Sequence, residues 1–499
     1  MGSPTLQTGL QTGPQTGLRI RQRSRLRAVC LLLGASAGLA ACGSDTTPDG
    51  AATSSGGEDL SMTAMAKKVP KVAPTAEATA AAGGARPGTP LTQAIPKLAD
   101  VSPEGDKTSA GSSWGAAESD TGTPLPQRPK PNDGAVSAYK DGLASATAGQ
   151  LDAAKQAFAR AIAADPKAYQ AEYALGVIAD RQGQPDEALQ HYGRALRIQP
   201  DYELAAQGSV NIMLRRGAPD AAVKYIEPIA KQWQRNLYLQ AIWADTLVRA
   251  NRLDEAEVAA RAALRRDERF VPAIVSLAKA SQSRGRDELG DSMLEQAHDI
   301  DANYAEVAFM QAKRSQTKGE LTQALASFRK AVELNPDYAD ARMALGIQYM
   351  ASGNYNEALE QFEATAKLVP TLLAAHLNLG DAYRALKRWQ DAKREFDKAL
   401  RMQAELPEAH FDLALMYMSV GTEFPGLTEL DALGRALIEF NTYRSQMGSR
   451  LGPSDGSVAY MADIQRRIDR EKKRIEREKA NADKEAQRKA RDAAAGKAK

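Results

Sequence analysis

Residues 169–202 read YQAEYALGVIADRQGQPDEALQHYGRALRIQPDY, and this stretch decides the fold because the chain repeats its pattern every 34 residues. The repeats start at residues 135, 169, 203, 237, 271, 305, 339, 373 and 407, and they align without a gap until the last unit. Self-similarity at such a period is the signature of a repeat array, in which each unit packs mainly on its neighbours.

Three positions of the repeat explain why it should fold. The eighth position is glycine or alanine in every repeat except the third, where it is Val210, and the twentieth is alanine or glycine in the first eight repeats. The twenty-fourth is large and apolar in most repeats, as at Tyr192, Phe362 and Phe396. Small residues let two antiparallel helices approach closely, the large residue fills the space between them, and a proline such as Pro200 stops the second helix.

This pattern resembles the tetratricopeptide repeat (TPR), and repeats two, six, seven and eight match it most closely. The resemblance implies an all-α superhelical solenoid of about nine helix–turn–helix repeats over residues 135–443. In repeats three to five the closing proline is replaced by Gln234, Glu268 and Ala302, so their stacking is expected to be less secure. Repeat nine contains a ten-residue insertion before its second helix.

The N-terminus predicts export. Residues 1–41 hold five arginines and no acidic residue, and a short apolar run ends at Leu39-Ala40-Ala41-Cys42. This order is typical of a secretory signal peptide, and the apolar run is too short to span a bilayer. The last four residues resemble the lipobox of bacterial lipoproteins, which implies cleavage before Cys42 and a covalent lipid such as palmitate on it. The alternative is an ordinary secretory signal.

The residues after Cys42 bear on localisation. Gly43 and Ser44 lack the aspartate that retains enteric lipoproteins in the inner membrane, so the resemblance favours a lipid anchor in the cell outer membrane, facing the periplasm. Residues 42–134 are predicted to be the lipidated cysteine and a disordered linker, because a segment rich in Ala, Pro, Thr and Gly without apolar periodicity buries too little surface to offset its ordering entropy. With one cysteine left after cleavage, a disulfide framework and a thiolate metal site are excluded.

The resemblance also implies a concave face that binds peptides or partner helices, lined in this family by positions 2, 5, 9, 12 and 13. The candidate partner-binding residues at these positions are Tyr173, Phe309, Met343, Ile347, Met350, Leu377, Phe411, Leu415 and Met418. Methionine-rich apolar grooves adapt to varied partners. The alternative is that these side chains pack against adjacent helices or against the chain's own C-terminus.

Residues 444–499 are predicted to form a linker and a charged helical tail. Residues 463–499 carry 14 basic and 8 acidic side chains, and Ile464, Ile468 and Ile475 form a thin apolar stripe. One interpretation is a solvated capping helix. The alternatives are a basic arm for anionic lipid or cell-wall polymer, or a helix that fills a partner's groove. Nucleic acid is not an expected partner, because the chain is exported and the tail interleaves acids with its bases.

Catalytic motifs are missing from the sequence. It has no phosphate loop and no paired-histidine zinc motif, and the nucleophile-elbow pattern around Ser36 falls in the signal peptide. His376 and His410 both stand at position four of adjacent repeats, which is a packing position in the family. We therefore expect a protein that is not an enzyme, with no metal, no cofactor besides the lipid on Cys42 and no small-molecule substrate.

The whole arrangement resembles the TPR lipoproteins of the myxobacterial adventurous gliding-motility apparatus. It implies a scaffold in a multiprotein cell-envelope machine, assembled with periplasmic and β-barrel partners. Two alternatives stay open: a pilotin-like assembly factor for a type IV pilus secretin, and a lipoprotein regulator of a peptidoglycan synthase. Pilotin-like proteins look shorter, and no separate activator domain follows the repeats here.

Overall fold

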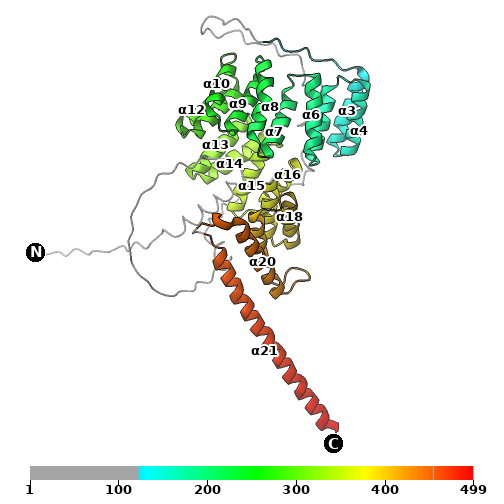
Figure 1. Ribbon diagram of the computed structural model, residues 1–499, viewed down its shortest axis with the longest axis vertical. Coiled ribbons are helices and arrows are strands. Elements are labelled where there is room, and N and C mark those ends of the chain that lie inside the picture. The colour runs from blue at the N-terminus through cyan, green and yellow to red at the C-terminus, as the bar shows by residue number, and fades with distance from the viewer. Residues whose placement is uncertain (1–122, 453–454, 498–499) are drawn as a thin grey trace, which may run out of the picture. The chain divides into compact units, whose positions relative to one another are not determined.

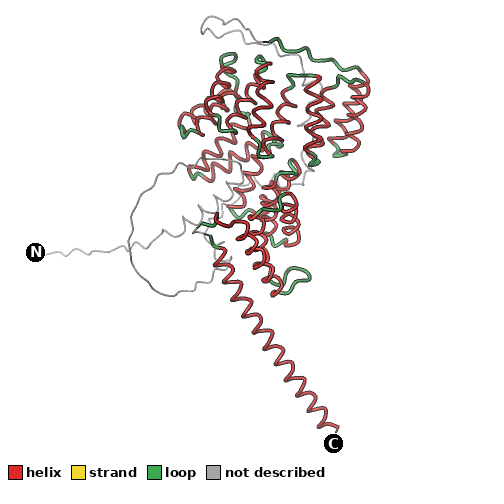
Figure 2. The backbone as a smooth tube through the Cα atoms, in the orientation of Figure 1, coloured by secondary structure: helices red, strands yellow, loops and turns green. Residues whose placement is uncertain are grey.

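The computed structural model describes residues 123–452 and 455–497, and every regular element within these ranges is a helix (Figures 1 and 2). The signal peptide predicted over residues 1–41, the lipid site at Cys42 and the linker up to residue 122 lie outside the described residues. Among the helices that are described, none is both long and apolar enough to cross a bilayer.

Antiparallel helix pairs follow one another along the chain, one pair to each predicted repeat. The first helices are α3 (Asp133–Thr147), α5 (Tyr169–Arg181), α7 (Glu203–Arg215), α9 (Leu237–Arg249), α11 (Val271–Ser283), α13 (Ala305–Lys318), α15 (Ala339–Ala351), α17 (Leu373–Ala385) and α19 (Pro407–Val420). The second helices are α4 (Leu151–Ala164), α6 (Pro185–Ile198), α8 (Pro219–Gln232), α10 (Leu253–Leu264), α12 (Asp287–Ile300), α14 (Leu321–Leu334), α16 (Tyr355–Leu368), α18 (Trp389–Met402) and α20 (Glu429–Met447). A short 3-10 turn, η3 (Gly448–Arg450), precedes α21 (Ser457–Lys497). The predicted fold class, an all-α superhelical solenoid, is confirmed.

In repeats one, two, seven and eight the hairpin packs closely where the glycine at its eighth position meets the ring at its twenty-fourth. In repeat seven, a Cβ atom placed on Gly346 of α15 would lie 2.5 Å from Cε1 of Phe362 on α16. In repeat two, Gly176 has the same relation to Tyr192. Phe362 is fully buried, so its ring occupies the space that a side chain at Gly346 would need. The glycine therefore sets how closely the two helices pack.

The turn inside each hairpin depends on position fifteen. Seven repeats place a glycine there at positive φ, from 54° at Gly421 to 83° at Gly319. Repeats four and eight place Asn251 and Lys387 there instead, at φ of 58° and 59°. A left-handed conformation costs a residue with a side chain about 1 kcal/mol, and least for asparagine. The sharp reversal is thus kept even where the residue is not glycine.

Repeats three to five form complete hairpins without a closing proline. Their second helices end at Gln232, Leu264 and Ile300, a few residues before the position where the proline stands in other repeats. Their twenty-fourth residues, Ile226, Ala260 and Leu294, are buried. Burial of the apolar face therefore stabilises these hairpins even though the stop signal is missing.

The array also makes a contact between distant repeats. Nη2 of Arg181, at the end of α5, donates to Oδ2 of Asp337 at 2.6 Å, although the two residues are 156 positions apart. Both side chains are about 15% exposed or less. A Cβ on Gly183, in the next turn, would lie 3.7 Å from Cβ of Pro370. The turns of repeat two thus touch the turns that follow α14 and α16.

Candidate functional site

Three of the nine candidate partner-binding residues lie in helix packing. Tyr173, Met343 and Leu377 are 8%, 1% and 3% exposed. The ring of Tyr173 lies 5.6 Å from that of Tyr192 and 5.4 Å from that of Tyr202. These side chains contribute to the cohesion of the array and leave little surface for a partner.

Three more candidates are partly exposed in repeats six and seven. Phe309 on α13 packs its ring 5.0 Å from Tyr338, and Nζ of Lys313 lies 5.7 Å from the centre of the Phe309 ring. Ile347 and Met350 lie on α15 with part of each side chain accessible. This stretch keeps an apolar surface on the first helices of two neighbouring repeats.

The last three candidates, Phe411, Leu415 and Met418, lie partly exposed on α19, where α21 joins the array. The ring of Tyr460 on α21 lies 6.2 Å from that of Phe411, and Nη1 of Arg467 donates to the carbonyl oxygen of Met418 at 2.7 Å. The first turns of α21 therefore occupy part of the surface that the sequence offered to a partner. This is the alternative in which the chain's own C-terminus packs there.

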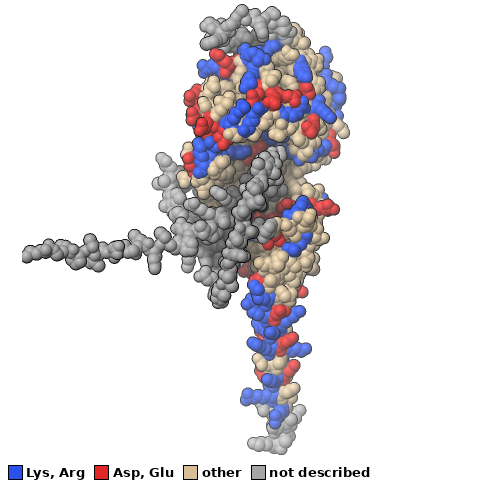
Figure 3. Space-filling model, turned by 60° about the vertical axis from the view of Figure 1, so that its left-hand side comes forward, with Lys and Arg blue, Asp and Glu red and all other residues tan. Residues whose placement is uncertain are grey.

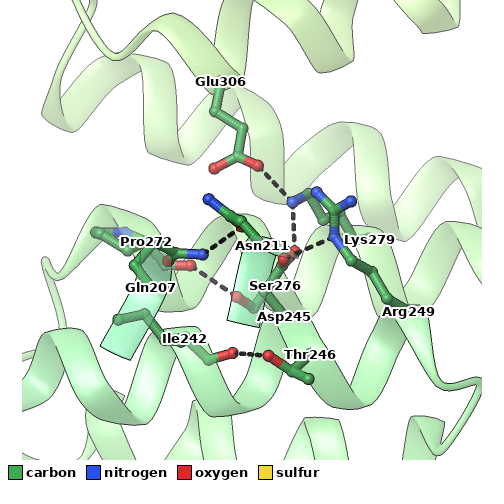
Figure 4. A network of polar contacts seen from close by, with 10 residues as sticks. All are labelled: Gln207, Asn211, Ile242, Asp245, Thr246, Arg249, Pro272, Ser276, Lys279 and Glu306. Atoms are coloured by element: carbon green, nitrogen blue, oxygen red, sulfur yellow. Dashed lines mark hydrogen bonds and ion pairs between the residues drawn. The ribbon is translucent and has the colours of Figure 1, made fainter. Parts of the chain in front are cut away.

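A polar network lies on α9, α11 and α13, the first helices of repeats four to six (Figure 4). Nζ of Lys279 donates to Oδ1 of Asp245 at 2.5 Å and also to Oε1 of Glu306. Nε of Arg249 donates to Oδ2 of Asp245 at 3.0 Å. We term Asp245, Arg249, Lys279 and Glu306 the central cluster. Its members occupy positions 2, 9 and 13, which line the concave face in the TPR family.

The central cluster is charged and balanced. Burial alone would raise the pKa of the Asp245 carboxyl, but Lys279 and Arg249 hold that pKa well below its usual range. Burial likewise opposes the charge on Lys279, while Asp245 and Glu306 raise the pKa of its ammonium group above the usual value. Asp245, Arg249 and Lys279 therefore stay ionised together at neutral pH, and the cluster holds two acidic and two basic side chains. Such a cluster can exchange ion pairs with a charged partner without an overall preference for its sign.

An exposed aromatic residue accompanies this cluster. Tyr238, at position two of repeat four, is 57% exposed. Its ring makes an edge-on contact with the mostly buried ring of Phe270, with the centres 5.1 Å apart. The neighbouring Tyr304 has a raised pKa, mainly because its hydroxyl group is buried. The next causes are electrostatic repulsion from Glu306, Tyr238 and Asp245, so these three residues lie close to the same hydroxyl group. An aromatic side chain that packs on a buried ring and is also open to solvent is the kind of residue that contributes most binding energy in protein interfaces.

Tyr238 and the central cluster are not among the candidate residues predicted from the sequence. The signal was available, because Tyr238, Asp245 and Lys279 occupy positions 2, 9 and 9 of repeats four and five. Repeats four and five lack the aromatic residue at position twenty-four and the closing proline that identify most of the other repeats. Their positions on the concave face were therefore not proposed as candidates.

The histidines have partners inside their own hairpins. Nδ1 of His376 lies 2.7 Å from Oε2 of Glu395, and its Nε2 lies 3.0 Å from the carbonyl oxygen of Pro370. Nδ1 of His410 lies 2.6 Å from Glu439, which stands at the equivalent position once the insertion of repeat nine is allowed for. Repeat two makes the same contact with the residue types exchanged, between Glu172 and His191. The pair thus fastens the two helices of a hairpin to each other. Across the described ranges, no group of three or more potential metal ligands comes together.

Parts of the repeat array match known family models. A model described as a tetratricopeptide repeat matches residues 139–203, and another of the same description matches residues 181–245, 317–371 and 349–416. A search of curated proteins found no match.

Solved structures resemble parts of the chain. The Cut9–Hcn1 hetero-tetramer of APC/C is 14% identical over 67% of this chain and 76% of its own, with a TM-score of 0.41. YrrB, described as a TPR protein with an unusual peptide-binding site, is 22% identical over 38% of this chain and 97% of its own, with a TM-score of 0.28. TTC0263 from Thermus thermophilus, described as a thermophilic TPR protein, is 23% identical over 37% of this chain and 98% of its own, with a TM-score of 0.31. These likenesses concern the fold alone.

Proposed function

Since the chain is built of tetratricopeptide repeats, we propose that it is a protein–protein interaction scaffold whose partner lies along the first helices of repeats four to seven. The observation that carries this proposal is the exposed Tyr238, which acts on the same neighbouring residue, Tyr304, as Asp245 and Glu306 of the central cluster. An aromatic anchor, a set of ion pairs and the partly exposed Phe309, Ile347 and Met350 supply the mixture of apolar and charged contacts that a protein segment recognises.

The proposal includes the site of action. Cys42 carries a lipid that anchors the protein in the outer membrane, and the repeats face the periplasm. What supports this is the order of residues 1–42: arginines, a short apolar run and Leu-Ala-Ala-Cys. A disordered chain as long as residues 43–122 would have a root-mean-square reach of roughly 50 Å. Such a tether would let the repeats meet partners well away from the membrane surface.

Within the cell envelope, the gliding-motility apparatus is the machine that fits the whole chain best. The supporting features are the number of repeats, the long segment before them and the charged helix after them. A pilotin-like role for a type IV pilus secretin and a regulatory role toward a peptidoglycan synthase are the competing assignments.

Deletion of the gene separates these three assignments. The proposal predicts loss of single-cell surface gliding, with pili, secretin multimers and cell shape unchanged, and recovery when the wild-type gene is restored. Loss of secretin multimers would assign the protein to pilus assembly instead. Altered cell shape together with sensitivity to β-lactams would assign it to peptidoglycan synthesis.

A further inference from the structure

The C-terminal helix α21 is longer than its docking on the array requires. Ile464 and Ile468 are buried against the array, and Arg467 contacts α19 and α20. Beyond residue 471 every described side chain of the helix is exposed. Figure 3 shows this segment with basic side chains along its length. Some twenty-five residues of helix therefore extend past the contact, about 38 Å at 1.5 Å per residue.

The basic side chains of α21 are not spread evenly around it. At 100° per residue, one sector of the helix about 60° wide holds seven of them. We term this set the basic stripe, and it consists of Arg466, Arg470, Lys473, Arg477, Lys484, Arg488 and Arg491. All seven are exposed. None of the acidic residues between Arg466 and Arg491 falls within the sector, so the stripe is a single-signed surface about 38 Å long.

The basic stripe faces away from the array. Ile464 and Ile468 lie on the opposite side of the helix, roughly 120° to 180° around the axis from the stripe. Since these two isoleucines are buried where α21 packs on α20, the array covers the apolar side and leaves the basic side open. A broad object can therefore approach the stripe without meeting the repeats near its start.

We propose that the basic stripe binds the surface of an anionic phospholipid membrane. A straight helix with seven cations in one narrow sector can bring all seven to a plane at the same time. The sector contains no large apolar residue, so it lacks the apolar core that protein interfaces have. Lysine and arginine near an anionic leaflet each add attraction without inserting into the bilayer. The inference does not depend on a lipid at Cys42.

Vesicle flotation tests this assignment on a protein that begins at residue 43, which removes Cys42 and retains every described residue. The wild type should float with vesicles of phosphatidylglycerol and phosphatidylcholine, and not with phosphatidylcholine alone. Raising the salt from about 0.1 M to about 0.5 M should release it, because surface charges are then screened.

Two triple variants with the same change in net charge give the decisive comparison. Lys473→Gln/Arg477→Gln/Lys484→Gln removes three cations from the stripe, and Lys472→Gln/Lys479→Gln/Lys489→Gln removes three from other sides of the helix. Glutamine is a good helix former, so circular dichroism should show the same helicity in both. The stripe variant should bind anionic vesicles at least about tenfold more weakly, and the control less than about twofold. Equal losses in the two variants, or equal binding to neutral vesicles, would overturn the proposal. Binding of the protein to poly-glutamate without any binding to vesicles would also overturn the proposal.

Discussion

Gly346→Leu is expected to unfold repeat seven and the hairpins that stack on it. A Cβ atom at this position would already lie within 2.5 to 2.9 Å of three atoms of the Phe362 ring, and leucine adds three more carbons. The ring is fully buried, so it cannot be displaced without moving the residues packed around it. Overpacking of this severity costs about 3 kcal/mol or more. Thermal melting followed by circular dichroism should show a lower and broader transition, because each repeat is stabilised mainly by its neighbours.

Gly193→Leu is the matched control for that substitution. Gly193 also lies inside a helix, α6, but nothing stands within 4 Å of where its Cβ would be. Leucine has a higher helix propensity than glycine by roughly 0.5–1 kcal/mol, so this variant should be as stable as the wild type or more so. If the two variants melted alike, close packing at the eighth position would not be what holds the hairpins together.

Cys42→Ala is expected to move the protein from the membrane fraction to the soluble periplasmic fraction. Each buried CH₂ group of an acyl chain contributes about 0.8 kcal/mol to membrane binding, and alanine cannot carry the chain. Fractionation should be done after a high-salt wash, so that any electrostatic attachment through α21 is removed first. Labelled palmitate should enter the wild type and not the variant.

The outcome for the Cys42→Ala variant also distinguishes a lipoprotein signal peptide from an ordinary secretory signal peptide. A variant that remains in the membrane pellet after the salt wash would contradict lipidation at Cys42. Release of both proteins by salt alone would show that the sequence before Cys42 is an ordinary secretory signal.

The repeats could be predicted from the sequence because their contacts are local. The eighth and twenty-fourth positions pack on each other within one hairpin, so the spacing in the sequence already contains the contact between Gly176 and Tyr192. Even the insertion in repeat nine could be placed, since Glu439 meets His410 after a shift of ten residues. The less secure stacking of repeats three to five stays a prediction, and these repeats form hairpins without the closing proline. Buried residues such as Ile226 and Leu294 stabilise those repeats without it.

Contacts between distant parts of the chain could not be predicted in this way. Nothing in a 34-residue period indicates that Arg181 pairs with Asp337, or that Arg467 reaches the carbonyl oxygen of Met418. The exposure of the candidate groove residues could not be predicted from the sequence either. The family positions identify which residues lie on the first helices, but burial of Met343 and Leu377 depends on how closely the neighbouring repeat approaches. That approach is set by the superhelix as a whole.

The central claim, that the first helices of repeats four to seven bind a protein partner, is tested most directly by photo-crosslinking in living cells. A photoreactive phenylalanine derivative replaces Tyr238 in one strain and Val258 in another. Val258 is a matched control because it is 64% exposed and lies on α10, the second helix of the same repeat. Irradiation should yield a discrete, higher-mass adduct from the Tyr238 strain and none from the Val258 strain. Equal adducts from the two positions, or no adduct at Tyr238, would contradict the account.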